Sequence, residues 1–348
     1  MWRVVDASLN RAAEGLRVAE EVLRFCGCAD GFSALKRLRH RLRQVFAPVR
    51  SQLLAARDTL SDPGRVTSTQ QEFQRRDISA VFAANIIRAQ EALRVLEETA
   101  KVHSPDMARE IESIRFEVYR IEKEWGGRLQ GRVVLQNARL YVVCSRGEDE
   151  AVRIAAAVAA VADIFQLRLK DVGGREYLRV ARGCREALSG SGTLFVVNDR
   201  SDVALLSGAD GVHLGAQDIP PDEARKMFCG IVGATVHNSD DLKSALQAGV
   251  DYLGVGAFYP TKTKKDARVQ GSALAEMMDG VDVVWFAIGG ITEERLGELV
   301  EMGVERVAVG EAICGADDVR GAARRMKERL LRLLAERGDD FNGVILEP

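Results

Sequence analysis

Apolar positions recur at helical spacing through the first third of the chain. Between Asp6 and about Glu124 they return every three or four residues, and the alternation typical of a strand is almost absent. Runs such as GFSALKRLRHRLRQVF and DISAVFAANIIRAQEALRVLEETAKV carry this spacing. The pattern predicts four or five helices, and hence an all-α bundle. Its one clear break is ARDTLSDPGRVTSTQQEFQ, where Pro, Gly, Ser and Thr gather as they do in a loop.

The hydrophobic spacing changes near EKEWGGRLQGR. Its glycines Gly126, Gly127 and Gly131 are expected to end the helical pattern. The predicted organisation is a helical domain, a linker, a second domain and a C-terminal tail, over residues 1–125, 126–138, 139–337 and 338–348.

Beyond the linker, short apolar strands alternate with helix-length segments. The strand candidates are RLYVVC, IFQLRLK, TLFVVND, DGVHLG, CGIVGAT, DYLGVGAF, VVWFAIGG and ERVAVG. Eight strands, each followed by a helical stretch, are typical of a (β/α)8 barrel. Three similar joints begin at Gly208, Gly249 and Gly303, which suit the left-handed residue that ends a helix. The predicted fold class is therefore α/β, a (β/α)8 TIM barrel preceded by an all-α helical-bundle domain.

Composition and charge exclude several classes of protein. Apolar residues make up 47% of the chain and charged residues 29%, and no apolar run approaches the roughly 18 residues that span a bilayer. The N-terminus MWRVVDASLNR shows no export signal. We therefore expect a cytoplasmic protein without a membrane partner. The net charge of −2 also argues against a nucleic-acid partner. Whether the chain forms a homo-oligomer stays open.

Polar residues gather where the predicted strands end, which is the active-site face of such barrels. Gln166, Arg168 and Lys170 alternate at the end of the second strand, so we expect them to point the same way into the barrel mouth. Asn198 and Asp199 end the third strand. Two cations beside amide groups suit an anion attached to a hydrogen-bonding ring.

Two carboxylates at neighbouring strand ends predict a magnesium site. Asp199 ends the third strand and Asp218 follows the fourth, in HLGAQD. Mg²⁺ prefers oxygen ligands from one or two carboxylates, with phosphate and water completing its shell. A second interpretation of Asp218 is that it caps the helix begun by IPPDEARK.

A second anion site is predicted on the other side of the mouth. The loop YPTKTKKD offers hydroxyl and ammonium donors from Thr261, Lys262, Thr263, Lys264 and Lys265. IGGI and VGEAI place Gly289, Gly290 and Gly310 after the seventh and eighth strands, the usual phosphate site of these barrels. A pocket for two anions, without a nucleophile and adjacent base, favours the joining of two phosphorylated small molecules.

These motifs together resemble thiamine-phosphate synthases. The order Q-x-R-x-K, N-D, a later Asp, P-T-x-T-K and G-G-I extends over about residues 140–334. The resemblance implies a transferase of thiamine biosynthesis, which joins hydroxymethylpyrimidine diphosphate to a thiazole phosphate and releases diphosphate. It implies that the pyrimidine-methylene to diphosphate bond ionises to a carbocation, which the thiazole nitrogen attacks.

The resemblance also implies residue roles. Hydroxymethylpyrimidine diphosphate would be bound by Gln166, Arg168, Lys170, Asn198, Thr235 and Lys264. Thiazole phosphate would be bound by Thr261, Lys262, Thr263, Gly290, Gly310 and Glu311. The catalytic residues would be Lys170, Asp199 and Lys264, and Asp199 with Asp218 would bind Mg²⁺.

Two departures from the family pattern leave this interpretation in place. Thr235 stands where Ser is common, and Ala216 and Gln217 replace the usual Gln-Glu before Asp218. The alternative is a thiazole tautomerase of the same barrel group, with His237 as proton carrier. Both metal carboxylates and PTKTK favour the synthase, because an isomerase expels no diphosphate.

The helical half contains an echo: RAAEGLRVAEE at 11–21 returns as RAQEALRVLEE at 88–98. Helical periodicity places Arg11, Glu14, Arg17 and Glu21 on one polar face and Ala12, Leu16, Ala19 and Leu23 on another. Arg88, Glu91, Arg94 and Glu98 repeat the polar face. The predicted pairs Arg17–Glu21 and Arg94–Glu98 stabilise such helices. A purely structural role for the echo and a ligand-binding role both stay open.

Several motifs of this half resemble a second, non-ribokinase type of hydroxymethylpyrimidine-phosphate kinase. DASLNRAAEGLRVAEE, LKRLRHRLR, AARDTLSDPG, STQQEFQR and AANIIRAQEALRVLEE recur in order over about residues 3–125. The resemblance implies ATP as a co-substrate, although no G-x-x-x-x-G-K-[ST] loop is present. Candidate site residues are Arg11, Glu14, Arg39, Arg57, Asp58, Asp62, Asp77, Arg88 and Glu91. The alternative is a non-catalytic dimerisation or regulatory bundle.

Overall fold

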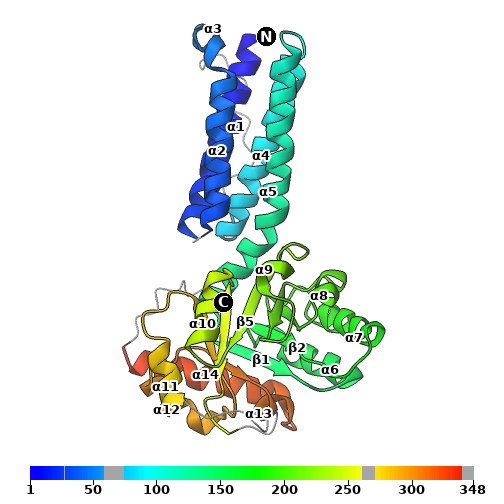
Figure 1. Cartoon of the computed structure of the whole chain (residues 1–348), viewed down its shortest axis with the longest axis vertical. Coiled ribbons are helices and arrows are strands. Elements are labelled where there is room, and N and C mark those ends of the chain that lie inside the picture. Colours follow the sequence, from blue (N-terminus) through cyan, green and yellow to red (C-terminus); the bar gives the residue numbers. More distant parts are fainter. Residues whose placement is uncertain (27, 59–73, 261–270, 339–348) are drawn as a thin grey trace. The chain divides into compact units, whose positions relative to one another are not determined.

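The computed structural model describes residues 1–26, 28–58, 74–260 and 271–338. It divides into two compact units, Met1–Val133 and Val134–Pro348. The first unit is helical, and the second is built around a closed parallel barrel (Figure 1). The predicted fold class is therefore confirmed. Within the described ranges no helix is both long and apolar enough to cross a membrane.

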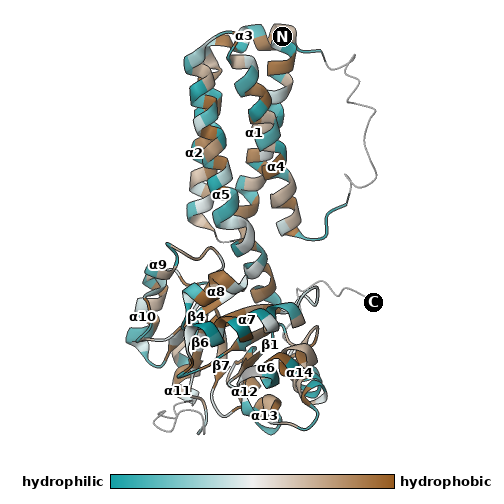
Figure 2. Ribbon diagram, turned by 90° about the vertical axis from the view of Figure 1, so that its right-hand side faces the viewer, coloured by the Kyte–Doolittle hydropathy of each residue, from teal (hydrophilic) through white to brown (hydrophobic). Residues whose placement is uncertain are grey.

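Long helices dominate the first unit, as the apolar spacing predicts. The described helices are α1 (Trp2–Phe25), α2 (Ala29–Val45), the 3-10 turn η1 (Ala47–Val49), α3 (Arg50–Ala56), α4 (Ile78–Ala100) and α5 (Pro105–Asn137). Each bundle helix carries apolar residues beside polar ones along its length (Figure 2). The apolar positions Ala12, Leu16, Ala19 and Leu23 of α1 are fully buried. The amphipathic pattern of the first echo segment is thereby confirmed.

Helices α1 and α4 pack against each other in opposite directions. The ring of Trp2, at the start of α1, stacks on His103, just after the end of α4, with 4.6 Å between centroids. Near the middle, a Cβ at Gly15 would lie 2.7 Å from the carbonyl oxygen of Asn85 and 3.2 Å from Cβ of Ala89. Gly15 thus permits a close approach of the two echo helices.

The repeat extends to the helices that follow the two echo segments, α2 after α1 and α5 after α4. Glu20 of α1 forms a buried ion pair with Arg39 of α2, and Glu97 of α4 forms one with Arg115 of α5, each at 2.7 Å. The apolar positions around these arginines also correspond: Leu35, Leu38 and Leu42 in α2, and Ile111, Ile114 and Val118 in α5, all buried. The helical unit is therefore two similar hairpins, a repeat wider than the echo visible in the sequence.

The predicted end of the helical pattern near Gly126 is wrong. Helix α5 continues through all three glycines to Asn137. The burial of Trp125 and Leu129 shows that the apolar spacing continues as well. A Cβ at Gly126 or Gly127 would meet nothing within 4 Å, so these glycines weaken the helix without breaking it.

Eight parallel strands close the barrel in sequence order. They are β1 (Leu140–Cys144), β2 (Ile164–Leu167), β3 (Leu194–Asn198), β4 (Gly211–Leu214), β5 (Ile231–Val236), β6 (Tyr252–Gly256), β7 (Val284–Ile288) and β8 (Val307–Val309). All eight predicted strands are confirmed. Each short apolar run is buried because it lies between the barrel interior and the surrounding helices.

Helical segments follow the strands. They are α6 (Glu148–Val158), α7 (Gly174–Ala187), α8 (Ser201–Ser207), α9 (Pro221–Ala224), α10 (Ser239–Gln247), α11 (Gly271–Met277), η4 (Glu293–Arg295), α12 (Leu296–Glu301), α13 (Glu311–Cys314) and α14 (Val319–Glu336). The three glycines predicted to end helices, Gly208, Gly249 and Gly303, have φ of 69°, 63° and 88°. These joints are therefore the left-handed turns expected from the sequence.

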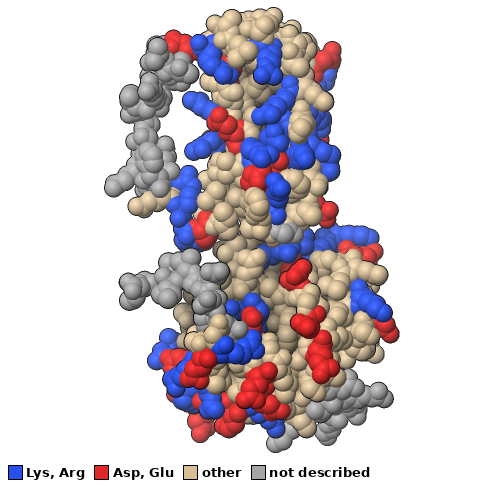
Figure 3. Space-filling view, turned by 90° about the vertical axis from the view of Figure 1, so that its left-hand side faces the viewer, with Lys and Arg blue, Asp and Glu red and all other residues tan. Residues whose placement is uncertain are grey.

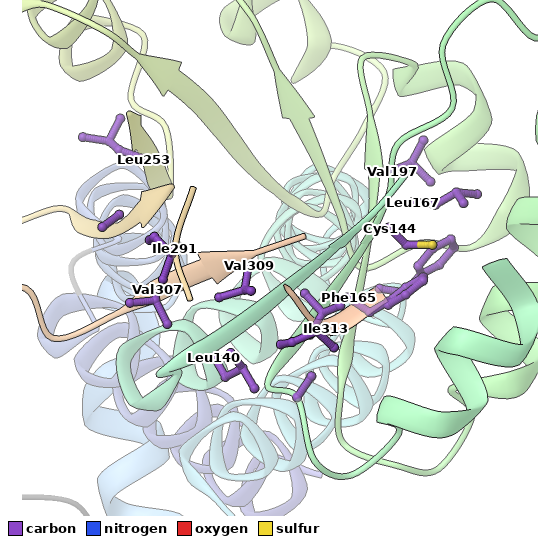
Figure 4. Packing of buried hydrophobic residues seen from close by; sticks show 14 of the residues in the cluster. Leu140, Cys144, Phe165, Leu167, Val197, Leu253, Ile291, Val307, Val309 and Ile313 are labelled. Carbon is purple, nitrogen blue, oxygen red and sulfur yellow. The ribbon is translucent and has the colours of Figure 1, made fainter. Parts of the chain in front are cut away.

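Side chains along each strand alternate between two apolar cores. One set, including Leu140, Phe165 and Val307, packs toward the outer helices (Figure 4). The other set fills the barrel interior and includes Tyr141 and Phe286. This alternation determines which residues of each strand reach the barrel mouth.

Candidate active site

The carboxyl ends of β2 and β3 hold the predicted pyrimidine-binding residues. Gln166 lies inside β2 and is 3% exposed. Strand β2 ends at Leu167, so the prediction that Arg168 and Lys170 belong to the strand is wrong. The backbone N–H of Arg168 still donates to the carbonyl of Cys144, at 2.8 Å. The segment after β2 therefore leaves the barrel gradually.

Lys170 and Asp199 come together at this face. Lys170 Nζ donates to Asp199 Oδ2. The Asp199 side chain is only 19% exposed, against 49% for that of Lys170. Asp199 has a φ of 65°, which is uncommon for residues other than glycine. Its N–H donates to the carbonyl of His213 in β4, at 2.8 Å. The carboxylate is thus held at the junction of β3 and β4.

Asp218 lies beside Asp199 and does not cap a helix. Its Oδ2 accepts from the N–H of Gly215, at 2.7 Å, whereas α9 begins after Pro220 and has no side-chain cap. Burial raises the pKa of Asp218, and the neighbouring carboxylate of Asp199 raises it further. A cation between the two carboxylates would relieve this repulsion.

Asn198 brings an unsatisfied donor to the same face. The residue is 5% exposed, and its carbonyl accepts from the hydroxyl of Tyr177, at 2.9 Å. Within the described part of the chain, its side-chain Nδ2 has no hydrogen-bond partner. Burying such a donor costs about 1–3 kcal/mol. A ligand oxygen or ring nitrogen would satisfy it.

Beneath these residues a chain of hydrogen bonds crosses the barrel interior. Gln166 Nε2 donates to Tyr141 Oη, at 3.0 Å, and the hydroxyls of Tyr141 and Tyr252 are 3.0 Å apart. His213 joins the chain through Nδ1, 3.2 Å from Tyr252 Oη, and through Nε2, 3.0 Å from Thr235 Oγ1. Sequence reasoning overlooked Tyr141, Tyr252 and His213. Their signal is polarity at inward strand positions.

The predicted second anion site is only partly described. Thr261, Lys262, Thr263, Lys264 and Lys265 lie outside the described residues. Gly289 and Gly290, after β7, have φ of 104° and 64°. The Gly290 carbonyl accepts from Arg295 Nη1.

Gly310 and Glu311 stand where β8 meets α13. Gly310 directly precedes this helix. A Cβ at Gly310 would lie 3.3 Å from the carbonyl oxygen of Val143. Both carboxylate oxygens of Glu311 accept from Arg146 Nη2, at 2.7 and 2.9 Å. Arg146, which follows β1, therefore links the first strand to this end of the barrel.

His237, considered as a proton carrier, follows β5. Its Nδ1 lies 2.5 Å from the carbonyl oxygen of Gly256 in β6, and its N–H donates to Asp241 Oδ2, at 2.9 Å. A carbonyl accepts only, so Nδ1 carries the proton in this contact.

In the helical unit, several predicted phosphate and metal ligands have protein partners. Arg39 is 5% exposed and pairs with Glu20 through two nitrogens, at 2.7 and 3.2 Å. Arg57 pairs with Asp6 in the same manner, at 2.8 and 2.7 Å. The structure thus gives the Arg39 guanidinium a buried protein partner, and its role as a phosphate ligand stays a prediction.

The two aspartates near this region also have protein contacts. Asp58 lies 3.4 Å from Arg3. Asp77 caps α4 by accepting from the N–H of Ala80, at 2.8 Å. Burial acts against ionisation of Asp77, but hydrogen bonds from Ser79, Ala80 and Arg76 outweigh it and lower its pKa to about 2. Asp62 lies outside the described residues.

The duplicated polar face remains exposed. Arg11, Glu14, Arg88 and Glu91 all lie on the surface of α1 and α4, and the structure gives them no ion pair within the described residues. The neighbouring predicted pairs Arg17–Glu21 and Arg94–Glu98 form, at 2.5 and 2.8 Å, and are confirmed. One face of the helical unit is rich in Lys and Arg side chains (Figure 3).

Comparison with known proteins follows the same division of the chain. Residues 140–313 match the thiamine monophosphate synthase family, and residues 3–124 match the ThiD2 family. A thiamine-phosphate synthase of Nostoc punctiforme is 37% identical over 341 residues, covering 97% of this chain and 96% of that protein. One of Gloeobacter violaceus is 39% identical over 335 residues, covering 95% and 97%.

A solved structure resembles the barrel. The thiamine phosphate pyrophosphorylase from Pyrococcus furiosus aligns with a TM-score of 0.52 and 33% identity, covering 60% of this chain and all of that one. The relatives in Nostoc and Gloeobacter cover nearly the whole chain and therefore both units. The Pyrococcus protein covers 60% of the chain. With the barrel, the strand-end residues and the full-length relatives in agreement, the chain belongs to the thiamine monophosphate synthase family, with a ThiD2-family domain at its N-terminus.

Proposed function

We propose that the barrel condenses 4-amino-2-methyl-5-hydroxymethylpyrimidine diphosphate with 4-methyl-5-(2-phosphoethyl)thiazole, or its carboxylated form. The products are thiamine phosphate and diphosphate. Membership of the family supports a thiamine-phosphate synthase of thiamine biosynthesis. The observation that carries the proposal is the group formed by Lys170, Asp199 and Asp218 at the carboxyl ends of adjacent strands. Its cation would bind the diphosphate, and its two carboxylates would bind the metal ion on that diphosphate.

Asp199 and Asp218 would hold Mg²⁺. The donor set fits this ion, because magnesium takes one or two carboxylates and fills its shell with phosphate and water oxygens. The described residues contain no cluster of three or more metal-ligating side chains, so the substrate would supply the remaining ligands. When bound, Mg²⁺ would neutralise charge on the leaving diphosphate.

The chain's own residues would bind and orient the pyrimidine diphosphate. Lys170, already within reach of Asp199, would place its ammonium group on a diphosphate oxygen. Asn198 would satisfy its buried Nδ2 by donating to the substrate. Gln166 and Thr235 would contact the pyrimidine ring, and Arg168 and Lys264 would add positive charge near the diphosphate.

Positioning and charge would carry the chemistry. The bond between the pyrimidine methylene and diphosphate oxygen breaks, the electron pair leaves with diphosphate, and the thiazole nitrogen forms the new bond to the methylene carbon. No proton is abstracted, so no general base is needed. The thiazole phosphate would lie against Gly290, Gly310 and Glu311, with Thr261, Lys262 and Thr263 from the neighbouring loop. The chain has both metal-binding carboxylates, Asp199 and Asp218. They favour this reaction over a tautomerisation by His237, because a tautomerisation expels no diphosphate.

The test of the barrel's function is Asp199→Asn in the full chain. The amide keeps the shape of the side chain and tolerates the left-handed backbone, but it removes the negative charge. We expect diphosphate release to fall at least about 100-fold, with unchanged circular dichroism. Asp222→Asn is the matched control, because Asp222 is exposed in the first turn of α9, and it should leave the rate unchanged. Activity of Asp199→Asn near that of the wild type would rule out the metal site.

We further propose that the helical unit phosphorylates hydroxymethylpyrimidine phosphate with ATP and Mg²⁺. The γ-phosphoryl group would pass to a phosphate oxygen of the substrate, giving hydroxymethylpyrimidine diphosphate and ADP. The ThiD2-family match supports this proposal, as do four exposed charged side chains, those of Arg11, Glu14, Arg88 and Glu91. The product would be the substrate of the barrel. The alternative is a non-catalytic dimerisation or regulatory bundle.

The Asp199→Asn chain also separates the two activities. With its barrel disabled, ADP formation from Mg-ATP and hydroxymethylpyrimidine phosphate reports on the helical unit alone. We expect ADP and the pyrimidine diphosphate to form in equal amounts, and Arg88→Ala in the same background to slow both. A folded chain that forms no ADP would favour the non-catalytic bundle.

A further inference from the structure

The five-residue chain Gln166–Tyr141–Tyr252–His213–Thr235, here called the interior chain, connects two residues at the mouth of the barrel. Its ends, Gln166 and Thr235, are the predicted contacts of the pyrimidine ring. Its three middle residues are each less than 10% exposed. Every link is a hydrogen bond of 3.0 to 3.2 Å. The interior of such barrels is ordinarily filled by branched apolar side chains, so this polar chain is an exception.

The barrel sequence makes room for this chain. A Cβ at Gly233 in β5 would lie 2.1 Å from Cζ of Tyr252, and one at Gly254 in β6 would lie 3.0 Å from Cε1 of His213. Gly233 is the register partner of Tyr252, and Gly254 is that of Thr235. Glycine inside a strand is unfavourable except where another group approaches closely. Both glycines are therefore explained by the rings of the interior chain.

Either tyrosine could donate to the other, but only one direction gives each tyrosine hydroxyl proton an acceptor within the chain. Gln166 Nε2 donates to Tyr141 Oη, so the single proton of Tyr141 is left for Tyr252. The proton of Tyr252 is then left for Nδ1 of His213. Burial raises the pKa of both tyrosines, which keeps these hydroxyl groups protonated. Since Nδ1 accepts, the His213 proton is on Nε2 and is donated to Thr235 Oγ1.

This direction sets what each end presents to a ligand. Because Nε2 of Gln166 is used within the chain, its Oε1 is left as an acceptor for a ligand. Because Oγ1 of Thr235 accepts from His213 in this direction, its own proton is left as a donor for a ligand. A 4-aminopyrimidine offers the complement, because its amino group donates and its ring nitrogen accepts. A 4-oxopyrimidine offers the reverse at both positions.

We propose that the interior chain, with His213 in its Nε2–H tautomer, fixes the orientation of the Gln166 amide and so selects a 4-aminopyrimidine over a 4-oxopyrimidine. Tyr141, Tyr252 and His213 are positioning residues in this scheme, since they act through Gln166 and Thr235. The inference rests on the proposed synthase function and adds to it the origin of ring selectivity.

The direct test is the tautomer of His213 in the substrate-free full chain. The chain has four histidines, so ¹⁵N imidazole spectra with a His213→Asn reference assign the signal. We expect a neutral ring with the proton on Nε2. In Tyr252→Phe, which removes one hydroxyl and keeps the ring, we expect a mixture of tautomers. A wild-type ring protonated on Nδ1, or a spectrum that Tyr252→Phe leaves unchanged, would overturn the inference.

Selectivity is the second readout. We expect Tyr252→Phe to reduce the ratio of kcat/KM for the 4-amino and 4-oxo pyrimidine diphosphates at least about tenfold, the equivalent of one hydrogen bond. Phe286→Leu is the matched packing control, because Phe286 stacks edge-on against both tyrosines without a polar contact. Phe286→Leu should alter neither the His213 tautomer nor the ratio.

If Tyr252→Phe does not fold, Tyr141→Phe breaks the neighbouring hydrogen bond and carries the same expectation. An unchanged ratio would contradict the inference.

The two claims fail separately. Wild-type synthase activity together with an Nδ1–H ring would refute the interior chain and leave the synthase intact. An Nε2–H ring in a chain that makes no thiamine phosphate would refute the proposed function, while the direction of the chain would stand.

Discussion

At the scale of single residues, Asp199 combines backbone strain with chemistry. Its φ of 65° costs a non-glycine residue roughly 1 kcal/mol or more. The same residue carries the carboxylate that meets Lys170 and raises the pKa of Asp218. Strain of this kind persists where the surrounding structure imposes it, often at functional sites. Asparagine is the informative substitution here, because it tolerates the backbone and removes only the charge.

Asp77 shows how a single cap links stability to pH. Its folded-state pKa is about 2, below the usual value of roughly 3.9. A depressed pKa stabilises the folded state above the unfolded pKa, and this contribution is lost as the pH falls from about 4 to about 2. We expect Asp77→Asn, which still caps the helix, to flatten the loss of stability in this window. Urea unfolding at several pH values measures the change. An equally steep loss in Asp77→Asn would contradict the role of Asp77.

Some residue roles were predictable and others were not. Asn198 ends an apolar run, Asp199 follows it directly and Asp218 comes four residues after the end of the next strand, so their place near the barrel mouth could be read from strand ends alone. The burial of Arg39 could not, because it depends on Glu20, nineteen residues away on another helix. The interior chain depends on strand register, which places His213 and Tyr252 on the same inner surface only once the barrel closes.

At the scale of elements, the two hairpins of the helical unit are locked by equivalent buried ion pairs. Removing one partner of such a pair leaves the other charge buried, at a cost of about 3–5 kcal/mol. We expect Arg39→Ala to lower the free energy of unfolding of the helical unit by about this amount. Arg37→Ala, on an exposed position of the same helix, should change it by less than about 0.5 kcal/mol. Urea unfolding followed by tryptophan fluorescence makes the comparison. Equal stability of the two variants would favour the predicted role of Arg39 as a ligand.

Helix α5 offers a test of continuity through its glycines. Gly127 is exposed, lies inside the helix, and has nothing within 4 Å of an added Cβ. Alanine at such a position stabilises a helix by roughly 0.5–1 kcal/mol. We expect Gly127→Ala to raise the free energy of unfolding by about that amount. A flexible linker at this position would instead show no gain in thermal or urea unfolding.

The strands were predictable for a physical reason that does not hold for α5. A buried parallel strand is a short, continuous apolar run, bounded here by the left-handed glycines Gly208, Gly249 and Gly303. Glycine inside a helix is only a weak signal. The buried Trp125 and Leu129 continue the apolar spacing across Gly126 and Gly127, and they outweigh that signal.

At the scale of the whole molecule, two units of separate families share one chain. The helical unit matches the ThiD2 family and the barrel the thiamine monophosphate synthase family. If both proposed activities hold, the chain makes thiamine phosphate from hydroxymethylpyrimidine phosphate, Mg-ATP and thiazole phosphate. We expect Asp199→Asn to accumulate the pyrimidine diphosphate in this mixture. Chromatography that separates hydroxymethylpyrimidine phosphate, its diphosphate and thiamine phosphate measures this accumulation. Accumulation of monophosphate alone would place the defect in the helical unit.

The most direct test of the central claim supplies the wild-type chain with hydroxymethylpyrimidine diphosphate, thiazole phosphate and Mg²⁺, and counts both products. We predict thiamine phosphate and diphosphate in equal amounts, and none of either when Mg²⁺ is chelated. Diphosphate released without thiamine phosphate would indicate a hydrolase, and absence of both products with Mg²⁺ present would contradict the synthase assignment of the barrel.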